Sequence, residues 1–149
     1  MIAAGLMAAF DAQLEANLLV AFFVPGIVYL ADAVGTQTEA LAIRGLSVGV
    51  GIRRVPAREA MTGLLVGVLL GALMFPAIAL VWGDVAVADA VALAVMAAST
   101  IATLVALALP WLLHRLGRDP AFGSGPLATV IQDLLSFLIY FTAVTALLP

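Results

Sequence analysis

Apolar runs long enough to cross a lipid bilayer alternate along the chain with short polar stretches. Residues 61–82 and 90–113 are uncharged over 22 and 24 positions, and about 20 apolar residues suffice to span a hydrocarbon core. A further apolar element precedes these two runs and another follows them. Pro25 lies in the preceding element and is expected to bend it, because proline removes a backbone donor. The pattern predicts one all-α, polytopic membrane domain over residues 1–149, with four full transmembrane helices at residues 17–50, 61–82, 90–113 and 126–148.

The first ten residues, MIAAGLMAAF, are apolar but too few to span a membrane. At about 1.5 Å per residue they cover about 15 Å, roughly half of a hydrocarbon core. No Lys or Arg precedes them, which argues against a cleaved signal peptide. We therefore expect residues 1–10 to form a partial first helix.

The composition agrees with a membrane protein and excludes several kinds of chemistry. Hydrophobic residues make up 65% of the chain and charged residues 10%, against about a half and a quarter in soluble domains. The chain has no cysteine and a single histidine, His114, so a zinc centre is not expected. We see no nucleophile–base pair, nucleotide-binding loop or redox centre. The expected surroundings are a lipid bilayer, and neither an enzyme activity nor a nucleic-acid partner is expected.

The placement of charge predicts a topology. One arginine-rich loop lies at residues 51–59, and Arg115 and Arg118 lie in the next loop but one. The loop between them, residues 83–89, has two acids and no cation. Because cytoplasmic loops are enriched in Lys and Arg, both arginine-bearing loops are expected in the cytoplasm and the C-terminus outside.

Two local patterns concern packing and helix ends. Gly63, Gly67 and Gly71 are four residues apart on one helix face, which allows another helix to approach closely. We favour packing within one chain over a contact between chains.

Asp119 followed by Pro120 is typical of a helix N-cap and first helical residue, and residues 123–126 are expected to interrupt that helix.

The last apolar segment contains an acid, Asp133. A carboxylate at the centre of a membrane-inserted helix costs about 2.5–3.5 kcal/mol on insertion scales. Thr129, Ser136 and Tyr140 are four, three and seven residues away and are expected on the same face. We interpret Asp133 as a cation-binding residue on a water-filled path, the alternative being a protonated or cross-bundle hydrogen-bonded structural acid.

A second polar group lies in the first long span. Asp32 and Glu39 are seven residues apart and share a helix face, and Thr36 and Gln37 add oxygen atoms. Mg²⁺ prefers oxygen ligands and retains several of its waters, so an acidic vestibule suits the hydrated ion. Pro126 is expected to break the last helix and expose carbonyls to the pathway.

Two stretches resemble the MgtE magnesium channel family, whose eukaryotic solute-carrier relatives share the same membrane unit. ADAVGTQTEALAIRGLSVG is similar to the family's second transmembrane segment, and RLGRDPAFGSGPLATVIQDLLSFLIYF to its last one. The resemblance implies a homodimer of five-helix membrane domains with a central pore. It also implies that Mg²⁺ is held, largely through water, near Asp133.

The chain departs from the family pattern in ways that bear on selectivity and gating. Gly125 stands where the family usually has an Asn, and Asp32-Ala33 replaces its usual Gly-Asn. The resemblance therefore implies a lost amide ligand and an added carboxylate. We expect a short form without the family's cytosolic N domain and CBS pair.

The leading hypothesis is a homodimeric Mg²⁺, or divalent cation, channel or transporter, multi-pass in the plasma membrane of a prokaryotic cell. The alternatives are a secondary transporter coupled to H⁺ or Na⁺ and a non-conducting partner subunit of a longer homologue. The expected metal-binding residues are Asp133, Asp32 and Thr129, and the expected pore-lining residues are Ser136, Gln37, Glu39, Thr36, Gly125 and Pro126.

Overall fold

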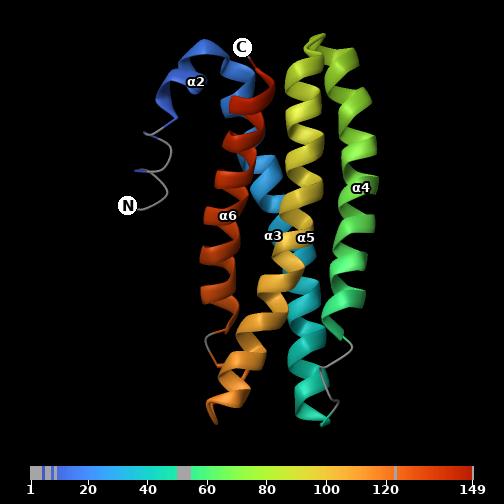
Figure 1. Cartoon of the computed structure of the whole chain (residues 1–149), viewed down its shortest axis with the longest axis vertical. Coiled ribbons are helices and arrows are strands. Elements are labelled where there is room, and N and C mark those ends of the chain that lie inside the picture. Colours follow the sequence, from blue (N-terminus) through green and yellow to red (C-terminus); the bar gives the residue numbers. More distant parts are fainter. Residues whose placement is uncertain (1–4, 6–7, 9, 50–54, 123, 149) are drawn as a thin grey trace.

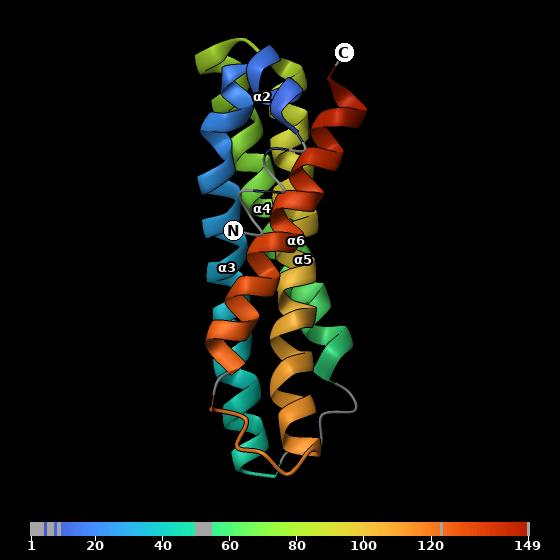
Figure 2. The same ribbon diagram turned by 90° about the vertical axis from the view of Figure 1, so that its left-hand side faces the viewer.

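The computed structural model describes residues 5, 8, 10–49, 55–122 and 124–148. The helices within that part are α2 (Asp11–Ala16), α3 (Leu18–Ser47), α4 (Val55–Trp82), α5 (Val85–Arg115) and α6 (Ser124–Leu147). Four of them, α3 to α6, are long and apolar enough to cross a membrane. They form an elongated bundle (Figure 1, Figure 2). The predicted all-α fold with four full spans is confirmed.

Helix α5 is the centre of the bundle. It packs against α3, α4 and α6 and is the most buried of the four spans, whereas α4 is the most exposed. Its inward face is built largely of small residues such as Ala94 and Ala98, which alternate with Val91 and Val95. Small side chains let the three neighbouring helices approach one central helix closely.

The glycines of α4 form a tight contact with α5. A Cβ added at Gly67 would lie 2.8 Å from the Cα of Met96, and one added at Gly71 would lie 3.0 Å from the carbonyl oxygen of Ala92. Because these are backbone atoms of the neighbouring helix, no side-chain rotation could make room. The predicted packing within one chain is confirmed.

Two helix N-caps stabilise the end of the bundle at which α4 ends and α5 begins. Asn17 caps α3 by accepting from the amide of Leu19, and Asp84 caps α5 by accepting from the amide of Val87. The two caps are joined, because Asn17 Nδ2 donates to Asp84 Oδ2 at 3.1 Å. Asp84, one of the two acids of the predicted loop at residues 83–89, therefore stabilises the start of a helix.

Several helix boundaries differ from the sequence prediction. Residues 11–16, between the predicted partial helix and the first predicted span, form the short helix α2. Helix α4 begins at Val55, inside the predicted arginine loop, because Pro56 is well tolerated in a first helical turn. Arg53, Arg54 and most of the predicted partial helix at residues 1–10 lie outside the described residues.

The prediction of a helix starting at Asp119 and Pro120 was wrong. Asp119 instead organises a turn, in which its side-chain Oδ1 accepts from the amide of Ala121 and its carbonyl accepts from the amide of Phe122. Helix α6 begins at Ser124, so Pro126 lies in its first turn. The predicted helix break at Pro126 is therefore wrong as well, because a first-turn residue has no intrahelical donor to lose.

Two of the described arginines and two of the described acids lie at opposite ends of the bundle, as the predicted topology requires. Arg58 and Arg115 belong to the end where α3 and α5 finish, and Asp11 and Asp84 to the end where α5 begins (Figure 1). The assignment of the arginine-bearing end to the cytoplasm stays a prediction from the charge bias.

Candidate cation site between α3 and α6

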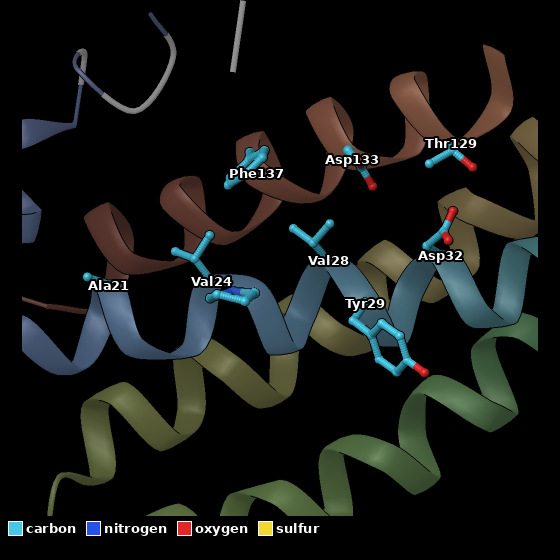
Figure 3. A pocket seen from close by; sticks show the side chains of 9 residues that line it. Ala21, Val24, Val28, Tyr29, Asp32, Thr129, Asp133 and Phe137 are labelled. Carbon is cyan, nitrogen blue, oxygen red and sulfur yellow. The ribbon is translucent and has the colours of Figure 1, made fainter. Parts of the chain in front are cut away.

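A groove of about 520 Å³ runs between α3 and α6. Figure 3 shows side chains from both helices meeting along it. Its lining is mostly apolar, and the lining residues are Ala21, Val24, Pro25, Val28, Tyr29, Asp32, Thr129, Asp133 and Phe137. The structure therefore brings together the three residues that the sequence predicted as metal-binding: Asp32, Thr129 and Asp133.

The polar atoms of the groove come from both walls. Asp32 projects from α3, while Asp133 and Thr129 project from α6 (Figure 3). One carboxylate oxygen of Asp32, Oδ1, is buried and has no hydrogen-bond partner. A buried carboxylate without partners is strongly disfavoured, and a cation in the groove would supply the missing interaction.

Pro25 also contributes to this groove. It lies inside α3, and because it has no N–H, the carbonyl of Ala21 one turn earlier lacks its helical donor. Ala21 and Pro25 both line the groove.

Ser136 and Tyr140 do not line the groove with Thr129 and Asp133, although the helical spacing puts all four on one side of α6. Both are buried within the bundle, and the Tyr140 hydroxyl donates to the carbonyl of Val20 at 3.1 Å. The buried residues of α6 recur every four positions, from Ser124 to Tyr140. A four-residue step overshoots a full turn by about 40°, so the buried stripe winds around α6 and reaches Ser136 and Tyr140 while passing beside Asp133.

The remaining predicted pore residues lie away from this groove. Thr36, Gln37 and Pro126 are exposed on the bundle surface, whereas Glu39 is buried. Glu39 lies beside the start of α6, since a Cβ added at Gly125 would lie 3.8 Å and 4.0 Å from its two carboxylate oxygens. Asp32 and Glu39 thus both lie on the side of α3 that faces α6.

Sequence reasoning missed Gln132. This side chain is 2% exposed, directly precedes Asp133, and its Oε1 has no hydrogen-bond partner. The sequence did contain a signal for this residue, because Gln132 falls in the same four-residue series as Ser136 and Tyr140. Among the described residues, the buried side-chain oxygens without partners are Asp32 Oδ1, Glu39 Oε1, Ser99 Oγ, Ser124 Oγ and Gln132 Oε1. All but the oxygen of Ser99 belong to α3 or α6.

A bundle of long apolar helices with carboxylates along a groove is typical of a polytopic membrane transport protein. The chain belongs to the MgtE family, described as divalent cation transporters, which matches residues 24–143.

Its curated relatives are bacterial proteins. It is 33% identical to the magnesium transporter MgtE of Bacillus subtilis over 98% of this chain, and 33% identical to that of Thermus thermophilus over 99%. The corresponding protein of Enterococcus faecalis is 30% identical over 93%. The chain spans about a third of the length of these relatives, 31–34%.

Proposed function

We propose that this chain moves hydrated Mg²⁺, or a closely related divalent cation, across the plasma membrane along the groove between α3 and α6. The observation that carries the proposal is the meeting of Asp32 and Asp133 from opposite walls of one mostly apolar groove. Membership of a family of divalent cation transporters supports the same function.

The ligand set favours a hydrated ion over a bare one. Within the described residues, no three His, Cys, Asp or Glu side chains gather to hold a metal. The two carboxylates and the Thr129 hydroxyl cannot complete the octahedral oxygen shell that Mg²⁺ demands, and Mg²⁺ gives up its waters reluctantly. In the proposal, Asp133 and Asp32 attract the ion and Thr129 contacts its waters.

A homodimer would complete this pathway. The groove is open rather than enclosed, and Thr36 and Gln37 are exposed on the same long helix, α3. Polar side chains within a span are unfavourable against lipid. A second copy of the chain would cover them and close the groove into a pore, with Glu39, Gly125 and Pro126 towards its inner mouth.

Coupled transport is the second candidate, because paired membrane carboxylates also serve as proton relays. The two functions differ in their driving force. The membrane potential alone supplies about 4.6 kcal/mol per divalent cation at 100 mV. Mg²⁺ flux into liposomes that follows the Mg²⁺ gradient and is independent of pH and Na⁺ would exclude the coupled carrier.

Asp133→Ala tests the proposal in cells that lack their own Mg²⁺ import. We expect uptake at limiting Mg²⁺ to fall at least tenfold. Removing a residue that supports a metal site from outside its direct ligands typically costs about 10–100-fold in affinity or activity. Asp89→Ala is the matched control, because Asp89 is an exposed acid on α5 outside this groove. Uptake by a membrane-inserted Asp133→Ala protein at the parental rate would contradict the proposal.

A further inference from the structure

The two helices that bear the carboxylates touch at a glycine. Gly35 is buried on α3, three residues beyond Asp32. A Cβ added at Gly35 would clash with Gln132 of α6, overlapping its Oε1 and lying 2.8 Å from Cδ and 2.9 Å from Nε2. The side-chain amide of Gln132 therefore occupies the space that any other residue at position 35 would need.

This contact lies within one helical turn of both acids. Gly35 follows Asp32 by three residues and thus belongs to the same side of α3. Gln132 immediately precedes Asp133, and its side chain extends towards the start of α6, as helical side chains do. A displacement of α6 at Gln132 would therefore move Asp133 relative to Asp32.

The contact leaves a buried polar atom of Gln132 unsatisfied. Gln132 is 2% exposed and its Oε1 has no hydrogen-bond partner, and leaving a buried polar atom unsatisfied is destabilising. An apolar residue at position 132 would avoid that cost. The amide fills the space above Gly35, which points to a role in spacing rather than in stability.

We propose that Gly35 and Gln132 are positioning residues that set the distance between the Asp32 and Asp133 carboxylates, and thereby the size of divalent cation that the groove accepts. This inference rests on the proposed function. A small change in this distance is enough to alter which ion fits. Oxygen ligands, the ion's own waters included, lie about 2.0–2.1 Å from Mg²⁺ and 2.3–2.6 Å from Ca²⁺, so the hydrated ions differ in radius by less than a helix displacement of about 1 Å.

A pair of substitutions tests the spacing role. Gly35→Ala should push α6 away from α3, because the amide of Gln132 is enclosed and has little room to move aside. Gln132→Ala in the same chain removes the clashing atoms and should restore the spacing. Gly45→Ala is the matched control on α3, since a Cβ there would meet nothing within 4 Å.

Two readouts are measured on each variant. The chain has no cysteine, so spin labels can be attached at Ala33→Cys and Val130→Cys, both exposed, with labelled chains diluted among unlabelled ones. Mg²⁺ and Ca²⁺ fluxes are measured in liposomes. We expect Gly35→Ala to lengthen the label distance and to lower the Mg²⁺-to-Ca²⁺ flux ratio by about tenfold, and the double variant to restore both.

The possible outcomes separate the two proposals. An unchanged distance or flux ratio in Gly35→Ala overturns the spacing role, as does a change that Gln132→Ala does not reverse. If the parent protein carries no Mg²⁺ while the distances respond as expected, the function proposed above fails and the control of helix spacing stands.

Discussion

The helix contacts α4–α5 and α3–α6 differ in how closely the helices pack. Between α4 and α5, Gly67 and Gly71 bring backbone against backbone. Between α3 and α6, a groove of about 520 Å³ stays open and carries two carboxylates. The threonines of α5 within the first contact satisfy their own hydroxyls, since Thr100 and Thr103 donate to carbonyls of their own helix. In the second contact, Asp32 Oδ1 is buried without a hydrogen-bond partner.

This difference shows how a small bundle can separate stability from function. Lipid is as apolar as the side chains that it would replace, so membrane helices associate through close packing and interhelical hydrogen bonds. The α4–α5 contact supplies the close packing. It leaves α3 and α6 free to hold polar groups at a spacing that would be poor for stability alone.

Overpacking the glycine contact should give the largest effect on stability. Gly67→Leu places a bulky side chain against the backbone of Met96, and we expect a loss of about 3 kcal/mol, the upper end of typical overpacking costs. Thermal unfolding of the purified protein measures it. Gly45→Leu, at an open position on α3, should change the midpoint little. An equal fall of the unfolding midpoint in the two variants would mean that the α4–α5 contact contributes no more to stability than the open position does.

Neutralising one wall of the groove should affect transport more than stability. Asp32→Asn keeps the side-chain shape and removes the charge, and we expect the Mg²⁺ concentration for half-maximal flux to rise about tenfold, equivalent to about 1.4 kcal/mol. The unfolding midpoint should not fall, because Asp32 has an unpartnered buried oxygen. Asp89→Asn is the control. A destabilised Asp32→Asn protein with unchanged flux would make Asp32 a structural residue.

Much of the fold could be predicted from the sequence, because hydrophobic length is a local property. The runs at residues 61–82 and 90–113 lie inside the helices α4 and α5, and the spacing of Gly63, Gly67 and Gly71 predicted their contact. The ends of helices were harder. Asp84 and Asp119 are both acids in polar stretches, yet the first caps a helix and the second organises a turn.

The candidate site was predictable in part. Asp32, Thr129 and Asp133 were singled out because polar atoms are rare in such apolar surroundings, and the fold places them in one groove. Ser136 was expected to line the pathway but is buried in the bundle away from the groove, because the part of α6 that packs against its neighbours is a property of the assembled bundle. Gln132 was overlooked although it falls in the same four-residue series as Ser136 and Tyr140, and its contact with Gly35 is visible only in the packed structure.

The central claim is that the groove between α3 and α6 is a water-filled cation path, and thiol accessibility tests it most directly. Because the chain has no cysteine, Val28→Cys reports on the groove beside Asp133, and Leu69→Cys reports on the exposed face of α4. The measurement is the rate of modification by a membrane-impermeant cationic thiol reagent, with and without Mg²⁺. We predict rapid modification of Val28→Cys, slowed by Mg²⁺, and slow modification of Leu69→Cys. Equal rates at the two positions, with no effect of Mg²⁺, would contradict the account.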